Sequence, residues 1–158
     1  MESSTLRRDT AWAMSEENVE LVRGILGAYE NLDLVAFMRD TDPADLRALY
    51  ESVYDRDIEI TWVDTNPNPG PFRGIDEAMR AFEEWFESFD EFFMRTTEYL
   101  DAGDKVVVTV VTPGRGKDSG AQVEMTVYCV IAVKGGKIAS YREYSTKAGA
   151  LEAAGLAE

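Results

Sequence analysis

The sequence contains no histidine and a single cysteine, Cys129, in 158 residues. The absence of histidine excludes the commonest general base, the Ser-His and Cys-His nucleophile systems and most zinc sites. One cysteine cannot form an internal disulfide, so the composition fits a reducing, cytoplasmic location. Acid–base chemistry in this chain therefore has to use Asp, Glu, Tyr, Lys or Cys side chains. We expect neither a metal nor a cofactor.

Basic residues are also scarce, since 16 Lys and Arg stand against 30 Asp and Glu, which gives a formal net charge of -14. Nucleic acids and anionic membranes both bind clustered Lys and Arg, so this balance argues against either as a partner. No apolar run approaches the ~20 residues needed to cross a bilayer. The acidity is expected to serve solubility.

A chain of this length with 45% hydrophobic residues is expected to form one domain with a sizeable core. The first residues lack the apolar segment of a signal peptide. We expect residues 1–14 to form a flexible extension and residues 15–156 to form the single domain.

The most informative stretch runs from Asp57 to Phe89. Apolar and polar residues alternate up to Trp62, which predicts a half-buried strand. A loop rich in Pro and Asn follows Asp64. From Ile75 the apolar residues are spaced by 3 and 4, which predicts a helix with one apolar face through Phe89. These elements are expected to form one wall of an apolar pocket.

Three helices are predicted around this strand, two before it and one after it. Ser15 is the candidate N-cap of the first, Asp33 precedes a short helical segment, and Asp42 with Pro43 starts the second. The later part of the chain is predicted to form strands over residues 93–100, 105–112, 121–133 and 138–145, with a polar loop over 113–120, and to end in a short helical tail. This order predicts an α+β fold: a cone-shaped, curved, mostly antiparallel sheet with about three helices packed on its concave face.

Three motifs together resemble the SnoaL-like branch of the nuclear transport factor 2-like superfamily: the helix start FRGIDEAMRAFEEWFE, the turn YLDAGDKVVV and the tail ALEAAGL. The resemblance covers nearly everything from Ser15 to Leu156. It implies an α+β cone with an apolar cavity and, frequently, a homodimer packed through the outer sheet face. Members of this superfamily include ketosteroid isomerase, polyketide cyclases and limonene epoxide hydrolase, so the fold alone does not determine the function.

Transferred residue by residue, the isomerase site is incomplete in this chain. The general-base aspartate of the isomerase falls at Trp62, with Asp64 two residues further on. Its oxyanion-binding tyrosine falls near Ile25, and its protonated aspartate falls at Cys129. The Asp-Arg-Asp set of the epoxide hydrolase is incomplete as well. Cyclases of the family use an acidic residue for acid–base work, and either Asp64 or Glu143 fits that role.

The resemblance also predicts which face of the last strands points inward. The inward residues are expected to be Val127, Cys129, Ile131, Val133, Ala139, Tyr141, Glu143 and Ser145. In an apolar cavity the pKa of Glu143 would be raised by desolvation, which suits acid–base work near neutrality; a salt bridge to Arg95 or Arg142 is the alternative. Asp64 either reaches the cavity or begins an Asx-type turn.

Two classes of function stay open at this point. The first is a protein that binds a small hydrophobic or aromatic molecule; the second is a cofactor-independent isomerase, polyketide cyclase-like enzyme or hydrolase. The catalytic candidates are Glu143 and Asp64. The candidate ligand-binding residues are Trp62, Tyr29, Tyr54, Phe82, Phe86, Cys129, Ile131 and Tyr141. Core packing is the alternative for the tyrosines and Cys129. The outer sheet face, with Tyr128 and Tyr144, is predicted to form a homodimer interface.

Overall fold

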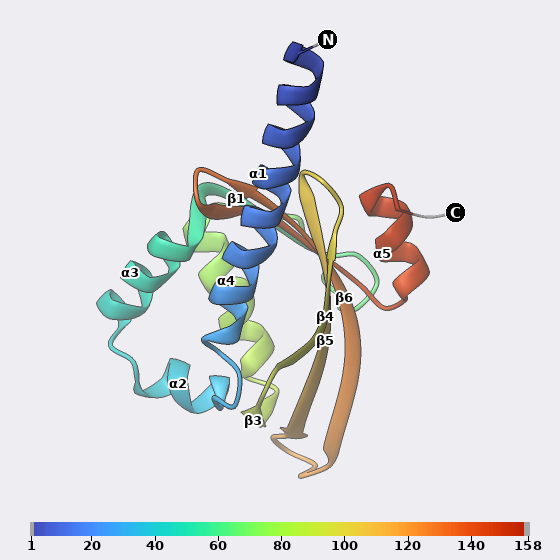
Figure 1. The fold of residues 1–158 in the computed structure, drawn as a ribbon. Coiled ribbons are helices and arrows are strands. Elements are labelled where there is room, and N and C mark those ends of the chain that lie inside the picture. The colour runs from blue at the N-terminus through green and yellow to red at the C-terminus, as the bar shows by residue number, and fades with distance from the viewer. Residues whose placement is uncertain (1, 157–158) are drawn as a thin grey trace.

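The computed structural model describes the backbone of residues 2–156 and the side chains of residues 15–156. Within these limits the chain forms five helices and seven strands (Figure 1). The helices are α1 (Glu2–Gly27), α2 (Leu34–Asp40), α3 (Pro43–Val53), α4 (Gly74–Phe86) and α5 (Lys147–Ala154). The strands are β1 (Tyr54–Trp62), β2 (Phe72–Arg73), β3 (Phe89–Phe92), β4 (Arg95–Asp101), β5 (Lys105–Gly116), β6 (Gln122–Lys134) and β7 (Lys137–Tyr144).

The seven strands form one curved sheet in the order β2-β1-β7-β6-β5-β3, and β4 also pairs with β5. All pairings are antiparallel except that of β1 with β7, which is parallel. The parallel pairing places Trp62, at the end of β1, opposite Glu143 on β7. The predicted α+β fold with a curved, mostly antiparallel sheet is confirmed, and the first and last strands lie side by side in it.

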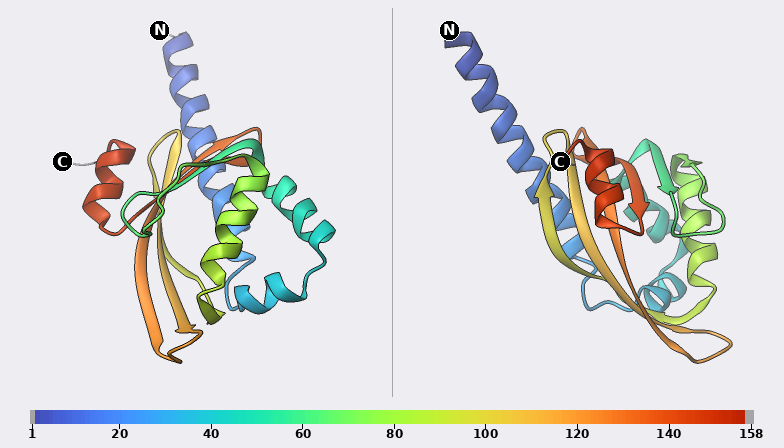
Figure 2. Two further views of the ribbon diagram at one scale, coloured as in Figure 1. Left: turned by 180° about the vertical axis from the view of Figure 1, so that it is seen from behind. Right: turned by 90° about the vertical axis from the view of Figure 1, so that its right-hand side faces the viewer.

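Helices α1 to α4 lie on one side of the sheet, and α5 lies on the other (Figures 1 and 2). The core lies between the four helices and the sheet. Its largest fully buried side chains include Ile58, Ile60, Ile131 and Ile138. Helix α4 adds the buried residues of its first turns and packs mainly on β1. This arrangement places the aromatic face of α4 above the inward face of β1 and β7.

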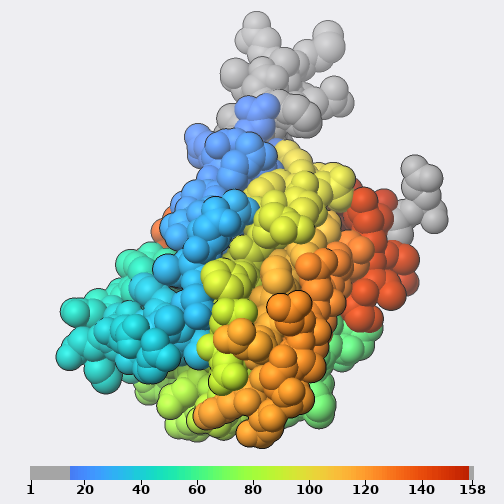
Figure 3. Space-filling model, turned by 90° about the horizontal axis from the view of Figure 1, so that it is seen from below, coloured from blue at the N-terminus to red at the C-terminus, as the bar shows by residue number. Residues whose placement is uncertain are grey.

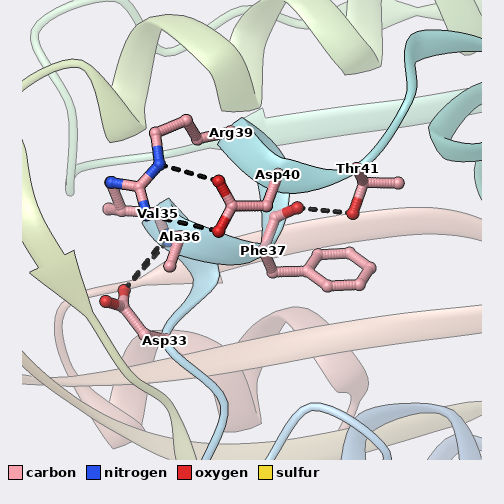
Figure 4. Close-up of polar contacts among 7 residues, drawn as sticks. All are labelled: Asp33, Val35, Ala36, Phe37, Arg39, Asp40 and Thr41. Atoms are coloured by element: carbon pink, nitrogen blue, oxygen red, sulfur yellow. Dashed lines mark hydrogen bonds and ion pairs between the residues drawn. The ribbon is translucent and has the colours of Figure 1, made fainter.

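Helix α2 is fixed at both ends by polar contacts (Figure 4). The Asp33 carboxylate accepts hydrogen bonds from two backbone N–H groups of the first turn and a third, at 3.1 Å, from the N–H of Phe92 on β3. At the other end, the Thr41 hydroxyl donates to the carbonyl of Phe37 at 2.5 Å. The predicted caps at Asp33 and Asp42 are confirmed. Helix α2 is therefore held over the concave side of the sheet.

The boundaries of two elements differ from the prediction. Helix α4 ends at Phe86, and Phe89 instead begins the short strand β3. Strand β5 continues through the predicted polar loop as far as Gly116, and β6 begins at Gln122. Continuous pairing of these two long strands makes one extended hairpin, and only residues 117–121 remain outside it.

A register shift between Ala132 and Val133 changes which residues of β7 face the core. Val133 pairs with Ile138, and Ile138 is fully buried in the core. Ala139, predicted to point inward, is the extra residue of this irregularity. Ser145 was also predicted to point inward, but it lies exposed beyond the end of β7.

The first helix begins earlier than predicted. Because α1 runs from Glu2 without a break, Ser15 lies inside it and is not its N-cap. The Ser15 hydroxyl instead donates a 2.8 Å hydrogen bond to Asp101 on β4. The flexible extension predicted over residues 1–14 stays a prediction, since Met1 and the side chains of residues 2–14 lie outside the described part of the chain.

Helix α5 covers part of the outer sheet face. Ala150 is fully buried there with Val107 and Val130, and Tyr128 and Tyr144 pack against this cluster. The sequence predicts that these two tyrosines lie in a dimer interface. In the structure the C-terminal helix of the same chain removes much of this apolar surface from water.

Candidate functional site

Two neighbouring pockets lie between the helices and the concave sheet face. The tyrosine pocket has a volume of about 110 Å³ and is lined by Tyr29, Tyr50 and Tyr54. The glutamate pocket has a volume of about 100 Å³, and Glu143 is the one charged residue among its lining residues. The two pockets share six lining residues, which are Leu34, Phe82, Phe86, Met94, Val110 and Tyr141. They therefore form two parts of one largely apolar site.

The β3–β4 segment forms the boundary of this site between the helices and the long hairpin. In Figure 3 its yellow-green residues separate the cyan helices α2 and α3 from the orange strands β5 and β6. Met94, between β3 and β4, lines both pockets. The sequence predicts a strand at this residue and gives no sign that it lines the cavity.

A chain of hydrogen bonds crosses the wall of the glutamate pocket. The Thr65 hydroxyl donates to Glu143 Oε2 at 2.5 Å, and the Tyr141 hydroxyl donates to Glu143 Oε1 at 3.0 Å. The Cys129 thiol in turn donates to the Tyr141 oxygen at 3.0 Å. Each carboxylate oxygen of Glu143 thus accepts one hydrogen bond. The proposed salt bridges are absent, because no ion pair among the described residues joins Glu143 to Arg95 or Arg142.

The Pro/Asn loop brings Thr65 to this carboxylate. The loop turns back on β1, and the Trp62 N–H donates to a carbonyl within it at 2.9 Å. Gly70 closes the turn with a φ of +89°, and a Cβ atom there would lie only 2.9 Å from the carbonyl oxygen of Ile60. A residue with a side chain does not fit this position. The parallel pairing of β1 and β7 then sets Thr65 beside Glu143.

Burial is the largest influence on the pKa of Glu143 and raises it above its usual range. Hydrogen bonds from Thr65 and Tyr141 act in the opposite direction, and the nearby Asp64 carboxylate raises the pKa further. Burial also raises the pKa of the Cys129 thiol and of the Tyr141 phenol. Near neutral pH, Cys129 and Tyr141 are neutral, so Glu143 is the acid–base candidate among these three groups.

The raised pKa of Glu143 predicts a specific dependence of stability on pH. The folded state binds the Glu143 proton more tightly than the unfolded state, so this group's contribution is greatest below its unfolded-state pKa and falls as pH rises to the folded-state pKa. Each unit of separation corresponds to about 1.4 kcal/mol. Glu143→Gln should remove this fall, because the amide does not titrate. Urea unfolding across a pH series measures the effect.

The matched control for this series is Glu17→Gln, on an exposed position of α1. We expect this control to follow the wild type at every pH. The stability of Glu143→Gln relative to wild type should instead improve as pH rises between the unfolded-state and folded-state pKa values of Glu143, and then level off. Parallel curves for wild type and Glu143→Gln would contradict the buried titration of Glu143.

Asp64 does not reach either pocket. Its side chain is exposed, and its two oxygens accept hydrogen bonds from the backbone N–H of Ser145 at 2.8 Å and from the Ser145 hydroxyl at 2.6 Å. These hydrogen bonds lower the pKa of Asp64. The structure therefore places this catalytic candidate outside the cavity, where it anchors the Pro/Asn loop to the end of β7.

Most of the predicted ligand-binding residues do line the site. Tyr29 and Tyr54 line the tyrosine pocket, Trp62 lines the glutamate pocket, and Phe82, Phe86 and Tyr141 line both. Cys129 and Ile131 do not, because both are fully buried in the core behind the pocket wall. Cys129 influences the cavity only through its hydrogen bond to Tyr141.

The three tyrosines of the tyrosine pocket come from different elements. Tyr29 lies in the turn after α1, Tyr50 lies on α3, and Tyr54 begins β1. Burial raises the pKa of all three phenols. Their hydroxyls make no hydrogen bond with any described residue, and all three side chains face the pocket. They are available to donate to an acceptor group of a ligand.

Thr65 and Trp85 both line the glutamate pocket but are not among the residues predicted for the site. The sequence contains a signal for Trp85, because Ala78, Ala81 and Trp85 form a second row with helical spacing beside the predicted apolar stripe. Ala78 and Ala81 are in fact buried. No sequence signal identifies Thr65, since its role depends on the pairing of β1 with β7.

The described residues contain no group of three or more His, Cys, Asp or Glu side chains that could hold a metal ion. None of their helices combines the length and the apolar character that a bilayer crossing requires.

Solved structures with the same fold come from several bacteria. A protein of unknown function with a cystatin-like fold from Xanthomonas campestris is 17% identical, with a TM-score of 0.62 over 89% of this chain and 98% of the other. A hypothetical protein with a ketosteroid isomerase-like fold from Catenulispora acidiphila, solved with trimethylamine, is 16% identical, with a TM-score of 0.60 over 87% of this chain and 93% of the other. A protein from Jannaschia sp. CCS1, named after SnoaL-like polyketide cyclases, is 18% identical, with a TM-score of 0.55 over 71% and 79%.

At these identities the likeness establishes the fold alone. A search of curated proteins gave no match. Residues 33–141, which include α2 to β6 and most of the pocket lining, match the model of the SnoaL-like domain. The chain therefore belongs to the SnoaL-like family, within the nuclear transport factor 2-like superfamily.

Proposed function

We propose that this protein binds a small, largely apolar molecule in the tyrosine and glutamate pockets, with Glu143 contacting a polar group of the ligand. The observation that carries the proposal is one half-buried carboxylate on the wall of an otherwise apolar and aromatic cavity. Sites for small molecules are typically concave, apolar and provided with a few oriented polar groups. The SnoaL-like fold supports this proposal, because the cavity lies inside its cone.

Val110→Phe tests the proposal by filling the site. Val110 is buried and lines both pockets, so a larger side chain there removes space from each. Using the fluorescence of 2-naphthol, a neutral aromatic probe, we expect saturable binding to the wild type and at least tenfold weaker binding to the variant. Val123→Phe is the control, because Val123 lies on β6 with 39% of its surface exposed. No saturable binding to the wild type, or equal binding by both variants, would contradict the proposal.

The second candidate function is cofactor-independent acid–base catalysis by Glu143, in an isomerase, cyclase or hydrolase reaction. The raised pKa of Glu143 favours it, because a general acid or base works best when its pKa lies near the operating pH. The hydrogen bonds from Thr65 and Tyr141 fix the orientation of the carboxylate. The Jannaschia neighbour is named after polyketide cyclases, which makes cyclisation of a polyketide the first natural reaction to test.

Pairing of two copies through the outer sheet face is also a proposal. Helix α5 leaves the first residues of β6, including Glu124 and Thr126, exposed, so two copies would meet there. A stable interface buries about 1,600 Å² in total, which this part of the long hairpin would have to provide. We expect a dimer in sedimentation velocity at micromolar concentration, and Thr126→Arg should shift it to the monomer. A monomeric wild type would contradict the proposal.

A further inference from the structure

Glu143 has no cationic partner among the described residues. Its two oxygens accept one hydrogen bond each, from neutral hydroxyl groups. The charged group that influences it is Asp64, which is another carboxylate. Buried carboxylates in proteins are usually paired with a cation, bound to a metal or protonated. The negative charge of Glu143 therefore has to be neutralised by the ligand or by a proton.

The walls around Glu143 favour a positive charge in that place. The rings of Trp62, Phe82, Trp85 and Phe86 line the same pocket, and Trp62 contacts Phe82 and Trp85 with ring centroids 5.8 and 6.3 Å apart. The described lining residues of both pockets include no Lys or Arg. Aromatic faces attract cations, whereas nothing in this lining neutralises an anion. An anionic ligand would meet the Glu143 carboxylate without compensation.

The small number of hydrogen-bond acceptors in the glutamate pocket favours an alkylated ammonium over a primary ammonium. A primary ammonium carries three N–H donors, and each needs an acceptor when it is buried. Besides Glu143, the polar side chains lining the pocket are Thr65, Asn66, Thr112 and Tyr141. Two of these already accept a hydrogen bond: the Tyr141 oxygen accepts from the Cys129 thiol, and the Asn66 side-chain oxygen accepts from the N–H of Asn68. A fully alkylated ammonium has no donors to satisfy and presents only methyl groups to the rings.

We infer that the glutamate pocket binds the alkylated ammonium head of an organic cation, with Glu143 as its counter-ion and the surrounding rings as its apolar wall. This inference rests on the proposed function, since it names the class of molecule that the same site binds. The remainder of the ligand extends past the shared residues into the tyrosine pocket. There, the free hydroxyls of Tyr29, Tyr50 and Tyr54 bind its oxygen atoms.

The groups that face Glu143 determine how binding depends on pH. They are Tyr141 on β7, Cys129 behind it on β6, and Thr65 and Asp64 on the loop after β1. Burial keeps the first two neutral, and hydrogen bonds from Ser145 keep Asp64 ionised. The pH dependence of ligand binding therefore reflects the ionisation of Glu143. A cation favours its ionised form, so affinity should increase as pH rises through the pKa of Glu143.

The test compares choline with 3,3-dimethylbutan-1-ol, a neutral molecule of nearly the same shape in which carbon replaces nitrogen. Binding is followed by calorimetry and by the fluorescence of the pocket tryptophans Trp62 and Trp85. We expect choline to bind wild type at least tenfold more tightly than its isostere at pH 8, and this preference to shrink at pH 5. Glu143→Gln should bind both molecules about equally, with its folding checked by circular dichroism.

The comparison within the wild type does not depend on any variant. Equal binding of the two molecules, tighter binding of the alcohol, or no binding of choline would overturn the inference. Saturable binding of 2-naphthol without binding of choline would leave the proposed function standing and remove only the cationic ligand. Failure of all three molecules to bind would contradict both.

Discussion

Replacing Ile60 by alanine is expected to lower the free energy of unfolding by about 2–5 kcal/mol. Ile60 has 0% of its surface exposed and lies in the second half of β1. It is paired with Phe72 on one side and Tyr141 on the other. Because both neighbouring strands fix the backbone, the surroundings cannot close the space left by the missing atoms. The loss therefore includes both the transfer free energy and the cost of a cavity.

Val63→Ala is the control for this substitution. Val63 follows the end of β1 and has 37% of its surface exposed, so its truncation should change stability by about 0.5 kcal/mol or less. Urea unfolding at pH 7, followed by circular dichroism and tryptophan fluorescence, measures both variants. Similar losses for Ile60→Ala and Val63→Ala would show that β1 does not lie at the centre of the core.

The elements of this fold could largely be predicted because their causes are local. The caps at Asp33 and Asp42 need only the first turn of a helix, and the alternation along β1 needs only a strand with one buried face. Alternation also predicted that Tyr141 and Glu143 share a face, which the hydrogen bond between them confirms. Local periodicity thus predicts the features that depend on residues two, three or four positions apart in the chain, such as helix caps and the faces of strands.

The parts that could not be predicted depend on contacts between distant segments. No local pattern specifies the parallel pairing of β1 with β7, which brings Thr65 to Glu143. The irregularity at Val133 shifts the alternation on β7 without a glycine or proline to mark it. Likewise, the alternation of the outer face of β6 showed that it must be covered, but the covering element was α5. Periodicity shows which face is buried but does not show what covers it.

The two catalytic candidates show the same limit within a single site. Asp64 and Glu143 are both carboxylates at strand ends, and the resemblance to cyclases fits either of them. The structure separates them, because Asp64 turns outward to Ser145 whereas Glu143 turns inward to Tyr141. Their pKa values move apart as a result: hydrogen bonds from Ser145 lower that of Asp64, and desolvation raises that of Glu143. Two similar residues thus differ in chemistry through burial.

This difference predicts the largest effect of any single substitution on reactivity. Glu143→Gln is expected to lower the rate constant kcat/KM for ring opening of 5-nitrobenzisoxazole by about 10²- to 10⁴-fold. In this reaction a base removes the proton on carbon 3, the N–O bond breaks, and the electron pair leaves on oxygen as a coloured cyanonitrophenolate. The flat substrate suits the aromatic pocket, and a carboxylate of raised pKa is a stronger base than one in water. Absorbance of the phenolate measures the rate.

Asp64→Asn is the matched control, because asparagine can still accept a hydrogen bond from Ser145 and Asp64 lies outside the pocket. Its rate should stay within about threefold of the wild type, since removing this charge alters the Glu143 pKa only slightly. In Glu143→Gln the amide keeps both hydrogen bonds, as its oxygen accepts from Tyr141 and its nitrogen donates to Thr65. A lost rate therefore reports the missing base rather than a disturbed pocket. If Glu143→Gln kept the wild-type rate while Asp64→Asn lost it, the base would be the exposed carboxylate and the acid–base role of Glu143 would be wrong.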